Sequence, residues 1–260
     1  MGAGVRLPVE REYVFICRSR RARGGPEEGT GASLPLGRRD DFIRRLGRAP
    51  GGTEVGPGAR LHGCPCTEDT CANAASGGHL AVLRWALEHD CPCGEDTCAS
   101  AAGGGFLEVL QLARQHNCPW DDNTCSEAAV GGFLEMLQWA REHDCPWDED
   151  TCAYAARFGH LAVLQWARQH DCAWDETTCM YAAERGHLEV LQWAREHHCP
   201  WDAATCSAAA EGGYLHILKW AREHGCPWDG DTLLLAHNSE VSQWARDHGC
   251  PTPEDEWGDV

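Results

Sequence analysis

The sequence predicts an all-α protein in which short helix-turn-helix units stack into a solenoid. Three ladders of residues, each with a step of 27 residues, lead to this prediction. Threonine recurs seven times from Thr70 to Thr232, glycine recurs from Gly78 to Gly213, and tryptophan recurs from Trp120 to Trp228. A fixed period of this kind is typical of repeat proteins, in which each unit packs only against its neighbours.

The ladders divide the 260 residues into three segments. Residues 58–253 form the repeat domain, with units that begin near residues 70, 97, 124, 151, 178, 205 and 232. Six units are full, and the seventh lacks three residues and its central turn, so we expect it to act as a cap. Residues 1–57 are rich in Arg, Gly and Pro without a sustained period, which favours disorder. Residues 254–260 form an acidic tail.

The unit at residues 151–177 predicts two helices separated by Gly159. Thr151 follows three acidic residues and offers a side-chain oxygen as the N-cap of the first helix, while the acidic charges suit its positive end. The second helix runs from about 160 to 170. Its inward residues, Leu161, Leu164 and Ala167, have helical spacing. Its polar residues point mostly outward; these are Gln165, Arg168 and Gln169.

The end of each second helix carries two further signals. The residue before the second cysteine of each unit is mostly Asp, Asn or Gly, the residue types that tolerate a left-handed backbone. A histidine stands near the end of each second helix, where its partial positive charge suits the helix dipole. These histidines are His89, His116, His143, His170, His197, His224 and His248. Because they recur in every unit, we assign them to capping rather than catalysis.

The segment AARFGHLAVLQWA, at residues 155–167, resembles the core of an ankyrin repeat. The resemblance covers about residues 64–253, and it implies an ankyrin-like solenoid that binds other proteins and has no catalytic activity. Ankyrin units usually have ~33 residues. The residues missing from these shortened CPWD-type units fall where ankyrin repeats extend a hairpin finger, so we expect a tight loop there.

The 17 cysteines raise the questions of zinc and of disulfides. Each unit supplies at most three candidate ligands, such as His143, Cys145 and Cys152, whereas structural zinc needs four. Equivalent cysteines of stacked helices would lie ~8 to 10 Å apart, beyond the reach of a disulfide. We therefore expect neither a metal nor bridges between repeats, but buried free thiols. A bridge such as Cys145 to Cys152 stays open on geometry, although a reducing compartment disfavours it.

Cysteine and tryptophan exchange at one position of the repeat. Cys66 and Cys93 stand where other units have tryptophan, which indicates an apolar slot filled in two ways. Paired tryptophans such as Trp166 and Trp174 could form a ligand cage. Their slots match buried aliphatic positions of ankyrin repeats, however, so we expect them to be core residues.

The resemblance also implies where a partner binds. In ankyrin proteins, first helices and fingers form the concave surface, and partners contact the positions that differ between repeats. The first helices of the units at 151 and 178 are the distinctive ones here, because they carry aromatic, thioether and guanidinium groups of the kind that dominate binding hot spots. The candidate binding residues are Tyr154, Arg157, Phe158, Met180, Tyr181, Glu184 and Arg185.

Charge and composition exclude several other classes. The formal net charge is -18, and the 12 arginines of residues 1–60 leave 10 basic and 33 acidic side chains for residues 61–260. An acidic body disfavours nucleic acid and favours a basic protein partner. No window approaches the ~18 apolar residues of a membrane span, and no export signal opens the chain. We expect a monomeric protein of the cytosol or nucleus without a cofactor.

The N-terminal segment supports one alternative function. The stretch LPVEREYVFI, at residues 7–16, faintly resembles the opening of an F-box, although the rest of that helical module is missing. A folded F-box-like segment would make the chain a substrate-recognition adaptor of a ubiquitin ligase. Without its structural context the motif remains a hypothesis.

Overall fold

A computed structural model describes residues 66–252, and these form seven helix pairs with no strand among them. The predictions for residues 1–57 and for the tail at 254–260 lie outside the described residues. The helices are α3 (Glu68–Ser76), α4 (Leu80–Glu88), α5 (Glu95–Gly103), α6 (Leu107–Gln115), α7 (Asp122–Gly131), α8 (Leu134–Glu142), α9 (Glu149–Arg157), α10 (Leu161–Gln169), α11 (Glu176–Glu184), α12 (Leu188–Glu196), α13 (Ala203–Glu211), α14 (Leu215–Glu223), α15 (Gly230–Leu234) and α16 (Ser239–Asp247).

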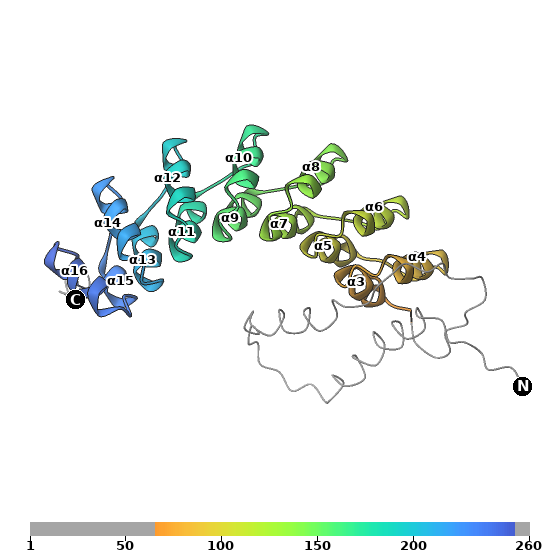
Figure 1. Cartoon of the computed structure of the whole chain (residues 1–260), viewed down its shortest axis with the longest axis horizontal. Helices are drawn as coiled ribbons and strands as arrows, with labels where there is room; N and C mark the ends of the chain where they lie inside the picture. The colour runs from red at the N-terminus through yellow and green to blue at the C-terminus, as the bar shows by residue number, and fades with distance from the viewer. Residues whose placement is uncertain (1–65, 253–260) are drawn as a thin grey trace, which may run out of the picture. The chain divides into compact units, whose positions relative to one another are not determined.

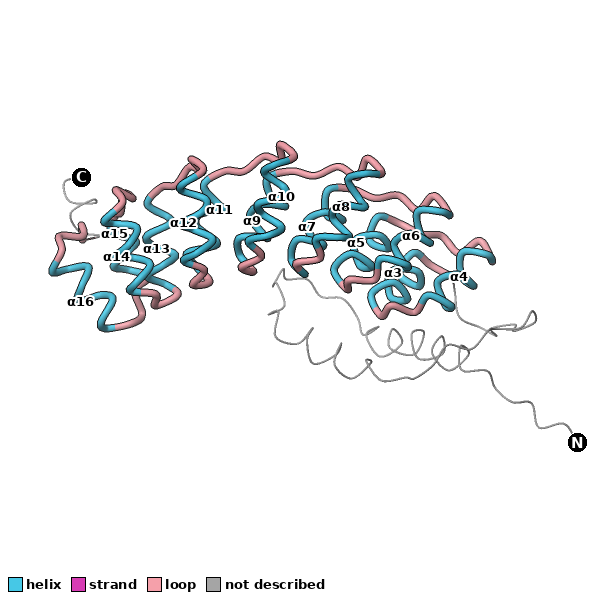
Figure 2. The backbone as a smooth tube through the Cα atoms, turned by 45° about the horizontal axis from the view of Figure 1, so that its top comes forward, coloured by secondary structure: helices cyan, strands magenta, loops and turns pink. Residues whose placement is uncertain are grey.

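The chain divides into two compact parts, Met1–Trp120 and Asp121–Val260, and each is described by itself. In the second part the first helices α7, α9, α11, α13 and α15 form one layer, and the second helices α8, α10, α12 and α14 form another (Figure 1). Short loops connect each second helix to the next first helix (Figure 2). Consecutive first helices contact each other, as α3 and α5 do in the first part. The predicted helical repeat architecture is therefore confirmed.

Small side chains in the first helices allow this close stacking. Ala155 and Ala156 of α9 are fully buried, and so are their equivalents in α11, Ala182 and Ala183. The second helices supply larger residues, such as Leu164, which is also fully buried. Alanine brings neighbouring backbones together, while the aliphatic face of each second helix covers the layer from the other side.

The predicted turns are confirmed. Gly159, between α9 and α10, has φ +76° and so occupies the left-handed region that glycine enters without strain. The residue before each second cysteine also has a positive φ. These residues are Asp90, Asn117, Asp144, Asp171, His198, Gly225 and Gly249. The second helix of the central unit spans Leu161–Gln169 between the caps His160 and His170, as predicted.

The predicted N-cap was wrong. The N-cap of α9 is Asp148, whose carboxylate accepts a hydrogen bond from the Asp150 N–H at 3.1 Å. Thr151 is the third residue of the helix and is fully buried, with Oγ1 3.5 Å from Ser126 Oγ of α7. Aspartate competes well for the cap position, and the threonine ladder faces the neighbouring repeat instead.

The tryptophans also differ from the prediction, because each described one is half-buried rather than part of the core. Trp174, in the loop before α11, lies with one face under the guanidinium of Arg168, 4.2 Å from its centroid, and meets Trp193 edge-on at 6.0 Å. The indoles close the outer edge of a helix pair, where solvent reaches part of each ring. The area that they remove from water is correspondingly smaller than that of a core residue.

The cysteines follow the prediction only in part. Among the residues that the structure describes, eleven cysteines are free and buried, as expected. Two disulfides are present, Cys66–Cys91 and Cys93–Cys118. They contradict the expectation that Cys66 and Cys93 are free thiols. They also contradict the expectation that no disulfide links one threonine-to-threonine unit to the next. The predicted unit began too late, because Cys66 lies in the loop that enters α3, and that loop belongs to the pair α3/α4. The spacing of stacked helices excludes a disulfide between equivalent cysteines of two repeats, whereas the bonded cysteines occupy different positions of the repeat.

The open pairing of Cys145 with Cys152 is not the one observed. The thiol of Cys152 is hydrogen-bonded to Cys172, which follows α10, and Cys145 pairs in the same way with Cys125. Cys172 Sγ also donates to the carbonyl oxygen of Asp148 at 3.2 Å. Hydrogen bonding to the second thiol and burial raise the pKa of Cys152. These thiols are thus structural groups that tie the exit loop of a pair to its entry loop.

Candidate functional site

The seven residues predicted for binding lie on two neighbouring first helices, α9 and α11, or at their C-terminal caps, Phe158 and Arg185. We call these seven residues the first-helix patch. Equivalent positions of consecutive repeats stand side by side in this layer, so residues 27 apart in the sequence become neighbours. The structure therefore brings together side chains that the sequence comparison selected one by one.

A pair of stacked tyrosines forms the middle of the patch. The rings of Tyr154 and Tyr181 are 6.2 Å apart between centroids, with an angle of 13° between their planes. Burial raises the pKa of the Tyr154 hydroxyl, and the negative charge of Asp150 contributes further. Stacked aromatic rings gain about 0.5–1.5 kcal/mol beyond the area they bury. The two rings thus form a flat surface that is ordered before any partner arrives.

A charged cluster continues the patch toward the C-terminal ends of the helices. Arg157 Nη2 lies 3.3 Å from Glu184 Oε1, and Arg185 Nε lies 3.2 Å from the same oxygen. The guanidinium carbon of Arg157 also stands 4.7 Å from the centroid of the Tyr181 ring. Each contact alone contributes little at a partly exposed site. Together the ion pair and the ring contact hold the side chain of Arg157 against Glu184 and Tyr181.

The outer groups of the patch remain open to solvent. Phe158 is 41% exposed and the side chain of Arg185 is 46% exposed. Apart from Leu234, Phe158 is the only large hydrophobic side chain classed as exposed among residues 66–252. Met180 is half-buried on α11 at the position that Ala153 fills on α9. An exposed aromatic ring and a half-exposed guanidinium group offer both apolar area and hydrogen-bond donors to a partner.

The charge of the first-helix layer changes along the helices. The first turns carry acidic side chains, Glu149 and Asp150 on α9 and Glu176 on α11. The opposite ends carry Phe158 and the arginines of the patch. Asp148, at the acidic end, has its pKa raised by burial and by the nearby charges of Asp122 and Asp150. Across α9 and α11 the face is therefore acidic at one end, and at the other it carries an aromatic ring and two guanidinium groups paired with Glu184.

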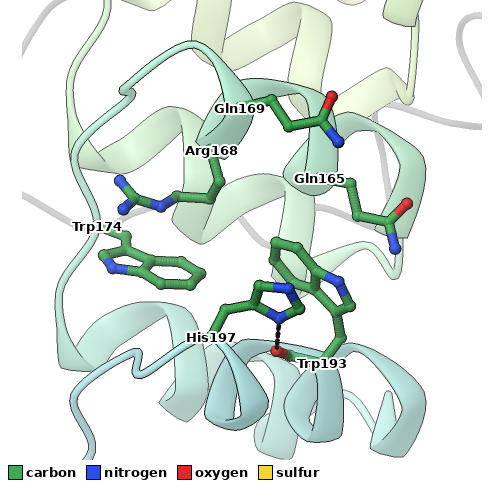
Figure 3. Close-up of a pocket in the computed structure, with 6 residues that line it drawn as sticks. All are labelled: Gln165, Arg168, Gln169, Trp174, Trp193 and His197. Carbon is green, nitrogen blue, oxygen red and sulfur yellow. Dashed lines mark hydrogen bonds between the residues drawn. The ribbon is translucent and has the colours of Figure 1, made fainter.

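A second surface lies between the second helices, and sequence reasoning missed it because it placed the indoles in the core. A groove of about 390 Å³ is lined by residues of α10, α12 and the loop between α10 and α11 (Figure 3). The ring of His197 stacks on Trp193 at 4.1 Å, and its Nδ1 lies 2.8 Å from the Trp193 carbonyl oxygen. The residues that line the groove are Gln165, Arg168, Gln169, Trp174, Trp193 and His197.

This groove has a structural explanation. A similar groove of about 490 Å³ lies further along the same part, with Arg222, Trp228, Trp244 and His248 at the matching positions. The histidine bond to the carbonyl four residues earlier also recurs, for example from His170 to Trp166 at 2.8 Å. Hydrogen bonds of this kind cap the C-terminal end of a helix, which agrees with the predicted role. A feature that recurs along the repeats provides no partner specificity, and so the first-helix patch is the better candidate site.

The described residues contain no group of three or more His, Cys, Asp and Glu side chains that could hold a metal ion. The paired cysteines are hydrogen-bonded thiols or disulfides. In the same residue range, no helix has the length and apolar character needed to cross a membrane.

The stacked pairs, their glycine turns and the variable face of the first helices define a helical repeat protein. The repeats are of the ankyrin type: residues 152–195 match the family model described as ankyrin repeats in many copies. Among solved structures, the human ASB11 ankyrin repeat domain is similar, with a TM-score of 0.54 and 13% identity. The match covers 70% of this chain and 98% of that one. No curated protein sequence matches this chain significantly.

The family match and the similar structure support an ankyrin repeat protein, and the fold agrees with the resemblance found in the sequence. Ankyrin repeats indicate a protein-protein interaction module. The ankyrin fold is typically a non-enzymatic interaction scaffold.

Proposed function

We propose that this protein is a binding scaffold that recognises a protein partner through the first-helix patch. The observation that carries the proposal is the cluster formed by Tyr154, Tyr181, Arg157 and Glu184 next to the exposed ring of Phe158. Hot spots are rich in tyrosine and arginine, and side chains that are ordered beforehand lose less entropy on binding.

The charge along the layer supports a particular kind of partner. We propose a segment that places an apolar side chain against Phe158 and basic side chains beside Glu149 and Asp150. The acidic excess of residues 61–260 would speed the approach of such a partner and repel acidic competitors. Binding should accordingly weaken as the salt concentration rises.

Affinity capture from a lysate of the source cells tests the proposal. The test variant changes Tyr154, Phe158, Tyr181 and Arg185 to Ala. The matched control changes Glu189 and Glu196 to Ala, two exposed residues of α12 in the second-helix layer. Circular dichroism and thermal unfolding verify that both variants are folded.

We expect the test variant to lose proteins that the wild type and the control both retain. If the test variant keeps the same partners, the patch is not the binding site. If wild-type protein captures nothing specific, the scaffold proposal itself fails.

We further propose that the protein acts in the cytosol or nucleus, which microscopy of a fluorescent fusion in the source cells would test. The adaptor alternative rests on residues 7–16, which lie outside the described residues. It predicts that a ubiquitin-ligase component copurifies with the full chain and is lost when residues 7–16 are replaced by Gly and Ser.

A further inference from the structure

The first two helix pairs are closed differently from the later ones. In the pairs α9/α10, α11/α12, α13/α14 and α15/α16, a tryptophan of the entry loop meets a tryptophan of the second helix edge-on, as Trp147 meets Trp166 at 5.8 Å. Cysteines take the place of the entry-loop tryptophan in the pairs α3/α4 and α5/α6. They form the disulfides Cys66–Cys91 and Cys93–Cys118.

The substitution is matched by its surroundings. Cys93 aligns with Trp147, and Leu112 of α6 aligns with Trp166, so both members of the aromatic contact are replaced in the pair α5/α6. The Cα atoms are 5.1 Å apart in Cys66–Cys91 and 5.5 Å apart in Cys93–Cys118, both within the range that a disulfide spans. Each bond joins the entry loop of a helix pair to its exit loop, whereas the tryptophan contacts of the later pairs join the entry loop to the second helix.

One cysteine of each disulfide is accessible to solvent and the other is buried. Cys66 is exposed and Cys93 is half-buried, whereas Cys91 and Cys118 are buried within the helix pair. The neighbouring free thiol, Cys71, is fully buried, and burial raises its pKa to about 11. Because thiolates are the reactive species, Cys71 is a poor competitor, and a small reagent reaches Cys66 and Cys93 first.

We propose that Cys66/Cys91 and Cys93/Cys118 are two reversible oxidation sites whose redox state sets the stability of helices α3–α6. The reagent is a low-molecular-weight disulfide such as oxidised glutathione. The accessible thiolate attacks it and releases one glutathione, which leaves a mixed disulfide on the protein. The buried partner thiol then attacks the protein sulfur and releases the second glutathione, so that two electrons pass from the protein thiols to the reagent. In a reducing compartment the dithiol form prevails, and oxidation closes the two pairs.

The experiment uses the full chain equilibrated in buffers of defined ratios of reduced to oxidised glutathione. Alkylation and peptide mapping identify which cysteines are paired, and amide hydrogen exchange reports local stability along the chain. A bridge that closes a loop of this length restricts the open state strongly. We therefore expect amides of α3–α6 to exchange at least about tenfold faster in the reduced protein, with α9–α16 unchanged.

Two variants make the test specific. Replacing Cys66 and Cys93 by Ser should reproduce the reduced behaviour under all conditions. Changing Cys93 and Leu112 to Trp restores the aromatic pair of the later repeats, and exchange in α5 and α6 should then ignore the redox state while α3 and α4 still respond. Mapping of Cys71–Cys91 and Cys98–Cys118 instead of the proposed bonds would overturn the assignment. Equal exchange in α3–α6 under oxidising and reducing conditions would overturn the proposed effect on stability.

Discussion

The turn between the two helices of a pair provides a quantitative test of how repeats support each other. Gly159 has φ +76°, and a Cβ added there would lie 2.7 Å from Cε1 of His187, the residue that enters α12 in the next pair. The left-handed conformation costs a residue with a side chain about 1–2 kcal/mol. The displaced imidazole would also lose its hydrogen bond to the Arg157 carbonyl, which adds about 1–2 kcal/mol. We expect Gly159→Ala to lower the free energy of unfolding by about 2–4 kcal/mol.

Gly213 is the matched control, because it occupies the same position two repeats later with the same φ of +76°. A Cβ there would meet only atoms of Asn238, at 3.8 Å, which is an ordinary contact. Gly213→Ala should therefore lose only the backbone term of about 1–2 kcal/mol. Urea unfolding followed by circular dichroism measures both variants, with the m-values compared to confirm a common transition. Equal losses would refute the idea that His187 couples the two pairs.

Three further outcomes follow from the described contacts. The pKa of Asp148 is raised by burial and by the charges around it, so its ionised carboxylate opposes folding at neutral pH. Asp148→Asn keeps an N-cap side chain and should leave the free energy of unfolding unchanged or raise it in denaturation at low salt. Added salt should reduce this gain, and the control Asp175→Asn should not reproduce it. Burial lowers the pKa of His187 below 6.5, so the stability present above pH 6.5 is lost as the pH falls, and His187→Phe should weaken that loss in denaturation across a pH series. Leu191→Ala should lower the free energy of unfolding in urea by about 2–5 kcal/mol because the side chain is fully buried. The exposed control Leu234→Ala should change it by no more than about 0.5 kcal/mol. Similar losses in the two variants would contradict the assigned core.

The repeat architecture could be predicted because each signal is local and recurs. Gly159 and the residues before the second cysteines require a left-handed backbone, which few residue types tolerate. The spacing of Leu161, Leu164 and Ala167 located the second helix to within one residue at each end. Local backbone preferences and helical periodicity thus suffice for helix pairs of this length.

The edges of the helix pairs could not be predicted in the same way. A tryptophan that recurs every 27 residues can be half-buried or part of the core, and the sequence pattern is the same in both cases. The burial of each ring depends on what covers it, such as the guanidinium of Arg168 over Trp174. The disulfide partners also depend on where a unit is taken to begin, since Cys66 enters α3 while the threonine ladder starts at Thr70. For the first-helix patch, the sequence supplied the residues, but only packing shows that Tyr154 stacks on Tyr181.

The most direct test of the binding face is site-specific photocross-linking in source-cell lysate. A photoreactive phenylalanine analogue replaces Phe158 in one protein and Ala162, an exposed residue of α10, in the other. Our account predicts that a partner protein cross-links at position 158 and not at position 162, and that the product disappears when Tyr154 and Tyr181 are changed to Ala. Cross-linking of the partner at position 162 alone would contradict the account and would place the binding surface on the second-helix layer.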